Sequence, residues 1–293
     1  MVNLSDRSIA LVAIAALGAV TFARGEDLGA MWGTAEREAE FYRLVDIPIP
    51  PEVPMHPGSF EILPDGKLAV GTRRGDVYFI SGAFDDPPAP KYELFASGQD
   101  EIFGLSWRDG SLTITQFGEV TKLTDTDGDG AADRFDTLTN NWGYAEGHEF
   151  AFGSKHDPDG NIWVVLGLSG SYNSHNLFRG WAVKVTPDGR MIPVCSGLRS
   201  PAGVAANAEG AMFCIESQGP WNGSCSLKHL KPGGFLGHPA SYNWYPFAEG
   251  IDTPANKPNS NSRLRIEKRR VPELVPPAVR FPYIKMGRSI SGF

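Results

Sequence analysis

A short turn signal recurs along this chain at nearly constant spacing. Each copy is a glycine that directly follows an acidic residue and separates two apolar segments. The four glycines are Gly66, Gly110, Gly160 and Gly210, at intervals of 44, 50 and 50 residues. Repeats of about 40 to 50 residues are typical of the four-stranded blades of a β-propeller. This repeat constrains the fold more than any other feature of the sequence.

The segments around each glycine have the pattern of β-strands. Residues 59–63 and 68–71 flank the first turn, and residues 76–80 form a third apolar segment. The same order recurs in residues 102–123, 149–185 and 203–230. Alternation with glycine, aspartate and proline at the breaks predicts antiparallel strands joined by hairpins. We therefore predict an all-β protein, a β-propeller of four-stranded blades.

The C-terminal part bears on the number of blades. Residues 246–277 are rich in proline, and we expect them to form a long loop after the fourth blade. Residues 279–284 have a strand pattern, and we expect them to begin a fifth blade. The sequence thus predicts four blades and the start of a fifth.

The N-terminal segment is expected to be a targeting signal. After Arg7, residues 8–23 form an apolar run of 16 residues, which is short for a membrane span but typical of a signal-peptide core. Because Asp6 offsets the charge of Arg7, an uncleaved membrane anchor is the alternative. We therefore predict a periplasmic or secreted protein with a signal peptide over 1–23, a linker over 24–50 and the propeller domain over 51–293.

The charge of the chain argues against nucleic acid as a partner. The formal net charge is -7 and the sequence pI is about 5.4, so no broad basic surface is expected. One basic run is present, formed by Arg263, Arg265, Lys268, Arg269 and Arg270 and interrupted by Glu267. We interpret it as a solvated strand and loop face.

The three cysteines fit an exported protein awkwardly, because one is left over after any pairing. Their spacing matches no zinc-ligand pattern. We expect Cys195 and Cys214 to be buried strand residues, with a disulfide from Cys225 as the alternative.

The residues that say most about chemistry lie between positions 197 and 239. Arg199 precedes a Pro-Ala-Gly turn, and Gln218, Gly219 and Pro220 follow the apolar strand 211–215. A guanidinium binds anions, while an amide side chain and backbone carbonyls offer oxygens to a hard cation. The segment thus combines an anion-binding arginine with a set of oxygen ligands.

The order of these motifs resembles the soluble quinoprotein glucose and sorbosone dehydrogenase family, six-bladed β-propellers that use pyrroloquinoline quinone (PQQ). The resemblance implies that Arg199 contacts the quinone and neutralises the charge that develops on it, and that Gln218 lines the cofactor site. It also implies that the carbonyls of Gly219 and Pro220 ligate calcium. Ser200 stands where the family's turn has asparagine. Because six blades are implied, we expect the chain to be incomplete at its C-terminus.

A second motif has the spacing of a calcium loop. Carboxylates at loop positions 1, 3, 5, 9 and 12, a glycine at position 6 and a backbone carbonyl at position 7 wrap calcium in a twelve-residue loop. The corresponding ligands are Asp125, Asp127, Asp129, Asp133 and Asp136, with the carbonyl of Ala131. Position 12 is aspartate instead of glutamate, and a strand precedes the loop. We predict a structural calcium here, with a solvated acidic turn as the alternative.

His148 is the candidate general base. It precedes the first strand of a blade, where the central loops of a propeller lie, and the resemblance places the family's base at this distance before an Asp-Gly turn. Alcohol oxidation needs a group that takes the hydroxyl proton as hydride leaves, and a neutral imidazole can do so. The alternative is an ordinary hydrogen-bonded histidine.

Two functions follow from these observations. The first is an exported quinone- and calcium-dependent dehydrogenase that oxidises a sugar or a related alcohol or aldehyde and passes electrons to an unknown acceptor. The second is a non-catalytic propeller that binds a glycan or protein partner. The fold alone does not choose between them.

Overall fold

The computed structural model describes residues 39–145, 148–282, 286 and 289–292. It divides into two compact units, Met1–Val45 and Asp46–Phe293. Of the first unit only residues 39–45 are described, so the predicted signal peptide over 1–23 and most of the linker over 24–50 lie outside the described residues. Everything below concerns the second unit. No helix in its described part is long and apolar enough to cross a membrane.

The second unit consists of antiparallel strands that follow one another in sequence order. The first sheet contains β1 (Pro57–Ile62), β2 (Leu68–Thr72), β3 (Val77–Ser81) and β4 (Lys91–Ala96). The next eight strands are β5 (Gly104–Arg108), β6 (Ser111–Thr115), β7 (Val120–Thr124), β8 (Arg134–Thr139), β9 (Ala151–His156), β10 (Ile162–Leu166), β11 (Trp181–Val185) and β12 (Met191–Ser196). The last sheet contains β13 (Pro201–Ala206), β14 (Met212–Glu216), β15 (Ser226–His229) and β16 (Val279–Arg280).

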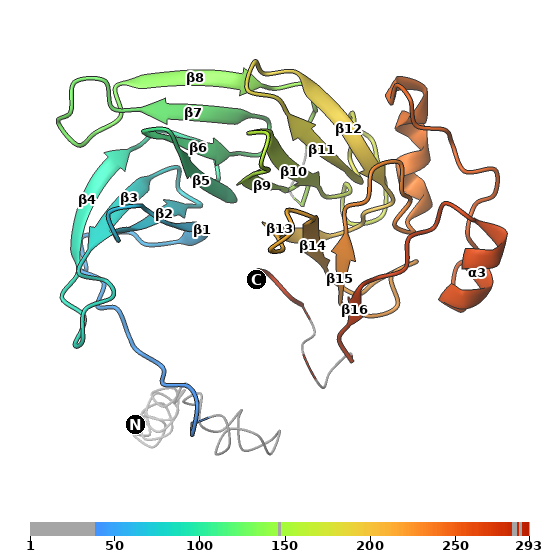
Figure 1. The fold of residues 1–293 in the computed structure, drawn as a ribbon, viewed down its shortest axis with the longest axis horizontal. Helices are drawn as coiled ribbons and strands as arrows, with labels where there is room; N and C mark the ends of the chain where they lie inside the picture. The colour runs from blue at the N-terminus through green and yellow to red at the C-terminus, as the bar shows by residue number, and fades with distance from the viewer. Residues whose placement is uncertain (1–38, 146–147, 283–285, 287–288, 293) are drawn as a thin grey trace, which may run out of the picture. The chain divides into compact units, whose positions relative to one another are not determined.

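The middle eight strands are two four-stranded units that touch at their inner edges. A parallel pairing of Gly104 with Gly153 joins β5 to β9. A side chain on Gly104 would overlap the backbone of Gly153, so this close approach requires glycine. Figure 1 shows β1, β5, β9 and β13 on the inner side of an arc, with β4, β8 and β12 on its outer side. This arrangement of curled sheets is that of a propeller.

The repeated turn glycines occupy equivalent positions in the four units. Gly66, Gly110, Gly160 and Gly210 each lie between the first and second strand of a unit, and their φ angles are 84°, 78°, 84° and 80°. A left-handed residue at this point is strained for any side chain except glycine, asparagine or aspartate. The turns predicted from the repeat are therefore confirmed.

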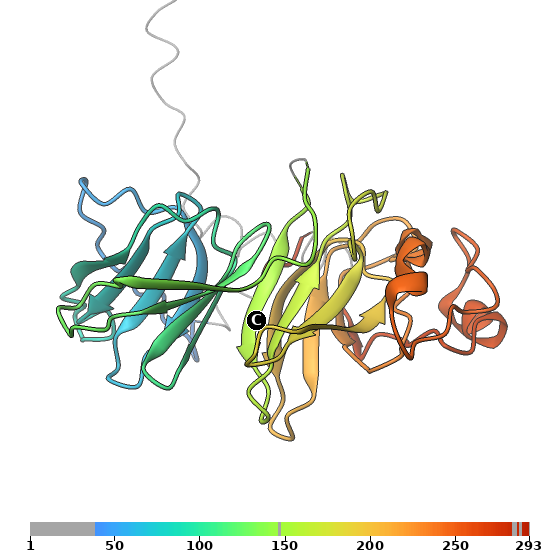
Figure 2. The same ribbon diagram turned by 90° about the horizontal axis from the view of Figure 1, so that it is seen from above.

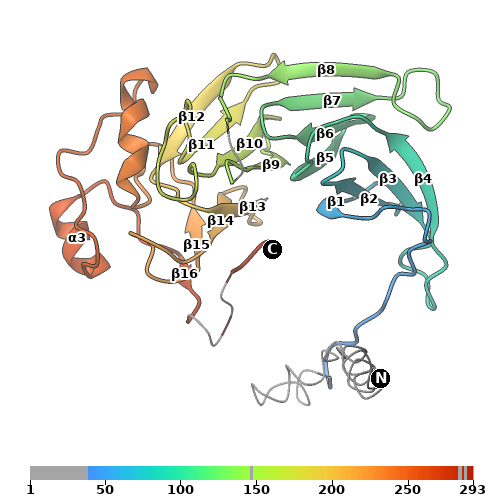
Figure 3. The ribbon, with the colours of Figure 1, turned by 180° about the vertical axis from the view of Figure 1, so that it is seen from behind.

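Apolar side chains pack between successive units. Phe79 and Phe95 of the first four-stranded unit (β1–β4) share a buried cluster with Leu112 and Leu123 of the second (β5–β8). A corresponding cluster joins the third and fourth units and includes the expected strand cysteines Cys195 and Cys214. All three cysteines are buried and none forms a disulfide, so Cys225 is a buried thiol as well. Figures 2 and 3 show the units side by side from two further directions.

The prediction of a fifth blade beginning at residue 279 is wrong. Strand β16 pairs with β15 through Leu227 and Val279, which makes it the fourth strand of the fourth sheet. The chain between β15 and β16, which includes the proline-rich residues 246–277, is accordingly an insertion within that sheet. It carries the 3-10 helix η1 (Pro239–Phe247) and the helix α3 (Leu264–Arg270). The free edge of β15 needs a strand partner, and loop-closure entropy rises only slowly with loop length, so a distant strand can supply it.

Candidate functional site

Arg199 lies between β12 and β13, where the chain passes from the third unit to the fourth. Its backbone carbonyl accepts a hydrogen bond from Leu168 N at 2.9 Å. Its guanidinium Nη1 donates to the carbonyl of Gln218 at 2.9 Å, and the guanidinium carbon lies 5.7 Å from the ring centre of Tyr172. The Nε atom is buried and has no hydrogen-bond partner among the described residues. A half-buried cation with an unsatisfied donor is suited to an anionic ligand.

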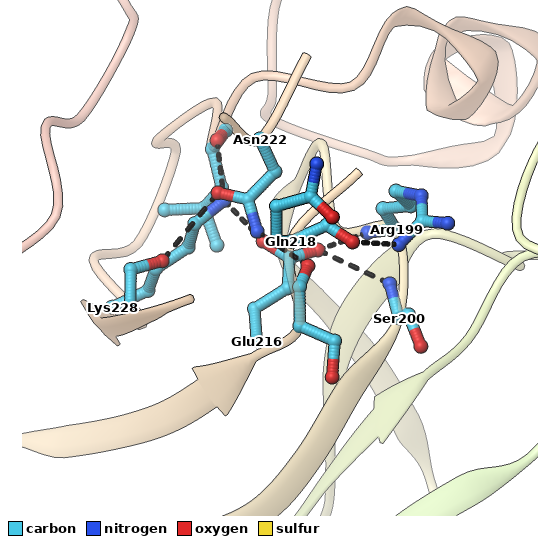
Figure 4. A network of polar contacts seen from close by, with 9 residues as sticks. Arg199, Ser200, Glu216, Gln218, Asn222 and Lys228 are labelled. Atoms are coloured by element: carbon cyan, nitrogen blue, oxygen red, sulfur yellow. Dashed lines mark hydrogen bonds and ion pairs between the residues drawn. The ribbon is translucent and has the colours of Figure 1, made fainter. Parts of the chain in front are cut away.

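The Gln218–Pro220 turn lies directly against this guanidinium (Figure 4). Gly219 N donates to Asn222 O at 2.8 Å, and Asn222 N donates back to Gly219 O at 3.0 Å. The Gln218 carbonyl faces Arg199, as the hydrogen bond shows, and a β-carbon at Gly219 would overlap the guanidinium. The structure therefore brings Arg199, Gln218 and Gly219 together, with Pro220 in the same turn.

A buried ion pair lies next to Arg199 and the Gln218–Pro220 turn. Glu216, the last residue of β14, and Lys228 of β15 form an ion pair whose side chains are 0% and 2% exposed. Glu216 also accepts hydrogen bonds from the backbone amides of Arg199 and, at 3.2 Å, Ser200. Lys228 Nζ donates to Leu236 O at 2.9 Å. Our sequence analysis missed this pair, although charged residues within strands of otherwise apolar pattern were a usable signal.

His238 stands in a turn-like Gly-His-Pro sequence that predicts an exposed histidine, but the structure buries it. Its Nδ1 accepts a hydrogen bond from Ala240 N at 3.3 Å, while its buried Nε2 has no partner in the described part of the chain. Its ring lies 4.9 Å, edge to face, from that of Trp221. Burial, followed by the positive charges of Arg199 and Lys228, lowers the pKa of His238 to about 4. The imidazole is therefore neutral at physiological pH.

His148 stands just before β9 and is exposed. Its backbone has a left-handed φ of 74°, and its ring centre lies 5.9 Å from that of Phe150. The chain just after β10 connects it to Arg199: Gly167 N donates to Phe150 O and Leu168 N donates to Arg199 O, both at 2.9 Å. The predicted base and the predicted cofactor arginine thus flank the same strand end.

Beside His148, a buried arginine organises the inner loops. Arg179 is fully buried, and its guanidinium donates to the carbonyls of Gly143, Glu149, Phe150 and Phe117. Burial lowers its pKa to about 10, and the charge of Glu149 opposes that shift. The Glu149 carboxylate itself accepts hydrogen bonds from Ser169 and Asn176. These contacts hold the backbone on either side of His148, and the sequence analysis did not identify them.

The acidic loop between β7 and β8 is a separate place in the molecule, at the outer side of the arc (Figure 1). Carboxylate oxygens of Asp125, Asp127 and Asp129 lie within 4.8 Å of one another. Backbone amides of Gly130 and Gly128 donate to Asp125, and these bonds hold the pKa of its carboxyl below the usual value.

The other predicted ligands of this loop are not part of this carboxylate cluster. Asp133 accepts hydrogen bonds from Thr126 N at 2.9 Å and Thr126 Oγ1 at 2.6 Å, and Asp136 pairs with Arg134 at 2.8 Å. Ala131 contributes its amide to Asp129 at 2.9 Å. The structure therefore brings together three of the five predicted carboxylates.

Comparison with solved structures finds proteins described as glucose or aldose sugar dehydrogenases and a protein of a carbohydrate-active enzyme family. An oxidoreductase from Thermus thermophilus, described as a glucose dehydrogenase, aligns with a TM-score of 0.52 at 18% identity, over 78% of this chain and 70% of that one. The PQQ-bound aldose sugar dehydrogenase of Streptomyces coelicolor gives 0.50 at 18% identity, over 75% and 70%. A Trichoderma reesei protein of the carbohydrate-active enzyme family AA12 gives 0.53 at 15% identity, over 67% and 57%.

Sequence comparison assigns the chain to one protein family. No curated protein sequence matches it. The family model described as a domain of unknown function, DUF7133, matches residues 64–243, which include the turn glycines, Arg199 and the Gln218–Pro220 turn. The chain belongs to the DUF7133 family, and its fold is that of the glucose and sorbosone dehydrogenase-like propellers.

Proposed function

We propose that this protein is an exported PQQ- and calcium-dependent dehydrogenase that oxidises a sugar or a related alcohol or aldehyde. The observation that carries the proposal is the Arg199 guanidinium, held against the Gln218–Pro220 turn with its buried Nε unsatisfied. The dehydrogenase-like fold supports the assignment. The periplasmic or secreted location and a complete ring of six blades are parts of the proposal that rest on the sequence.

The residues around Arg199 fit an anionic quinone. A carboxylate or quinone oxygen would satisfy the Nε donor, whose burial makes an unpaired state unfavourable. The backbone carbonyl of Gln218 and the exposed ring of Tyr172 adjoin the same guanidinium. Gly219 leaves room for the guanidinium because it lacks a β-carbon. Ser200 stands where the resembled family has asparagine, and its backbone amide donates to Glu216.

Calcium has two proposed sites with different roles. At the cofactor, the carbonyls of Gly219 and Pro220 are the proposed ligands. The Gly219 carbonyl accepts one hydrogen bond, from Asn222, and retains a second lone pair. In the loop after β7, Asp125, Asp127 and Asp129 are the proposed core of a structural site, because clustered carboxylate oxygens are the ligands that calcium prefers. The solved structures related in fold include a calcium structure of the Trichoderma reesei AA12 protein.

Arg199 and His148 take different parts in the proposed reaction. When bound, PQQ would supply a two-electron acceptor for the hydride of the substrate. Arg199 neutralises negative charge at the cofactor, where a charge-assisted contact in a dry site contributes strongly. His148 is exposed at the rim of the inner loops, and its imidazole takes the hydroxyl proton of the substrate.

The test is reconstitution of the protein with PQQ and calcium. Quinone absorbance and retention after desalting report binding, and reduction of an artificial dye with a panel of aldoses and alcohols reports turnover. Arg199→Ala should lose quinone retention and turnover together. His148→Gln should retain the quinone and lose turnover by about 10²–10⁴-fold. The matched controls are Arg190→Ala, in the turn between β11 and β12, and His229→Gln, at the end of β15 remote from the Gln218–Pro220 turn. Neither should change either reading.

One result would favour the alternative function. If the wild-type protein retains no quinone in the presence of calcium, the dehydrogenase proposal is wrong. A propeller that binds a glycan or protein without catalysis would then be the better interpretation.

A further inference from the structure

A pocket of about 930 Å³ opens in the fourth sheet's insertion, beyond the turn that contacts Arg199. One wall is the Gly219–Ser224 turn, and the opposite wall is the segment 258–269, which includes part of α3. The lining includes Trp221, Asn222, Pro258, Arg263, Arg265 and Arg269. A volume of this size is typical of small-molecule and oligosaccharide sites.

The lining is strongly cationic in a protein whose formal net charge is -7. Besides the three arginines of the opposite wall, Lys268 and Arg280 line it. Glu267 is the acidic residue of the lining, and its Oε2 already accepts bonds from Asn259 N at 2.9 Å and Arg270 Nη1 at 2.7 Å. Across the described part of the chain, no carboxylate pairs with Arg263, Arg265, Arg269 or Arg280. The basic run is exposed, as expected of a solvated face, but it lies on the helix α3 and its N-cap instead of on a strand. Four of its residues also line this hollow.

The remaining lining is apolar or neutral and polar. Pro258, Pro276 and Leu274 give apolar surface, while Asn222, Asn259 and Ser262 give amide and hydroxyl groups. Flat apolar surface suits the C–H faces of sugar rings, and amides and hydroxyls pair with sugar hydroxyl groups. The combination with guanidinium groups suits a sugar that carries anionic substituents.

Trp221 lines the same pocket, and two contacts hold its side chain in place. Its backbone has a left-handed φ of 57°, an unfavourable conformation for a bulky residue, and its side chain is 37% exposed. The indole Nε1 donates to Pro258 O at 3.1 Å, which joins the two walls, and His238 packs edge to face against the ring. Strained residues held by their surroundings are concentrated at binding sites.

We propose that this pocket binds an oligosaccharide that carries carboxylate or sulfate groups. The arginines pair with the anionic groups, the Trp221 ring and the prolines contact sugar faces, and the asparagine and serine groups bind hydroxyls. The proposal does not depend on the dehydrogenase function, because none of these side chains takes part in the proposed reaction. The two sites share only Gly219, which lies in the wall of this pocket and is also a proposed calcium ligand. An acidic peptide would use the arginines but not the aromatic ring in this way.

Binding is measured by titration calorimetry of the complete chain without added quinone. The probes are an oligogalacturonate, a heparin-derived sulfated oligosaccharide, a malto-oligosaccharide of matched length and an oligoglutamate. At least one anionic sugar should bind at least about tenfold more tightly than the neutral sugar and the peptide, and more weakly at high salt. The galacturonate and heparin arms distinguish carboxylate from sulfate. Binding of neither anionic sugar, or equal binding of the neutral one, would overturn the proposal.

Two variants test the assignment to this pocket. Arg265→Glu combined with Arg269→Glu should weaken binding by at least about tenfold, whereas Arg190→Glu combined with Lys231→Glu, an equal charge change elsewhere, should not. Trp221→Asn keeps a residue that tolerates a left-handed φ and should also weaken sugar binding about tenfold. Equal losses in both charge-reversed proteins would indicate nonspecific attraction. Oligoglutamate binding as tight as that of the sugars and insensitive to Trp221→Asn would indicate a peptide site; both outcomes overturn the proposal. Arg265→Ala serves if the double variant does not fold.

Discussion

The α-carbon of Gly219 lies directly against the guanidinium of Arg199. A β-carbon at Gly219 would overlap Arg199 Cζ. The three heavy atoms nearest to that β-carbon all belong to the Arg199 guanidinium. The hydrogen bond from Arg199 Nη1 to Gln218 O, 2.9 Å long, depends on this approach. The turn and the arginine therefore form one unit, in which the missing side chain of residue 219 sets the position of the cation.

Gly219→Ala should displace the Arg199 guanidinium while leaving the fold intact. The overlap is with the flexible end of a long side chain, and the φ of Gly219 is not in the left-handed region, so we expect the free energy of unfolding to change by no more than about 1 kcal/mol. Quinone affinity should fall about tenfold or more. Gly223→Ala is the matched control, because a β-carbon there meets nothing within 4 Å. Unchanged quinone binding in Gly219→Ala would contradict the assigned position of Arg199.

Lys228→Met should destabilise the protein strongly. It leaves the buried carboxylate of Glu216 without its cation, and breaking a buried ion pair costs about 3–5 kcal/mol. Lys67→Met, which removes an exposed partner 3.3 Å from Glu93, should cost no more than about 1 kcal/mol. Urea unfolding measures both. Similar costs for the two variants would show that the buried pair is not as the structure has it.

Calcium should raise the melting temperature through the loop after β7. At a hundredfold excess over Kd, a ligand that binds only the folded state stabilises it by about 2.7 kcal/mol. Asp127→Asn combined with Asp129→Asn should abolish the calcium-dependent shift, because it removes two of the three clustered carboxylates. Asp109→Asn combined with Asp159→Asn makes the same charge change in two other turns and should retain the shift. A shift that survives the first pair of substitutions places the calcium elsewhere.

Stability should fall between about pH 6.5 and pH 4 in a way that depends on His238. Its folded pKa is lowered to about 4, mainly by burial and then by Arg199 and Lys228. In this range the unfolded chain binds a proton that the folded protein does not, so stability is lost as pH falls, by about 1.4 kcal/mol per pH unit at most.

His238→Asn isolates this contribution, because asparagine can still accept the Ala240 amide at the start of η1. The pKa of His156 is also lowered and acts in the same direction, but equally in both proteins. Unfolding free energies measured from pH 4 to pH 7 should therefore show a shallower slope for the variant. Parallel curves would mean that His238 does not titrate as the structure implies.

Much of the architecture was predictable from residues that are close in sequence. Gly66 and its three counterparts mark the hairpins because a left-handed turn depends on one or two neighbouring residues. The position of Arg199 beside the Gln218–Pro220 turn also followed from short motifs. The supporting pair Glu216 and Lys228 did not, since alternation within a strand shows which face a residue takes but not what it meets there.

The sequence by itself determined the repeating hairpins, the spacing of the four units and the identity of the residues around Arg199, because all of these depend on local backbone preferences and on contacts with the next hairpin. Only the tertiary structure decided that residues 279 and 280 complete the fourth sheet, that Asp133 and Asp136 bond to Thr126 and Arg134 instead of joining the three clustered carboxylates, and that a basic run lines a pocket. The first and the last of these features join segments that are distant in the chain. Their free energies depend on which partner a strand edge, a carboxylate or a cation finally meets, and no local pattern encodes that choice.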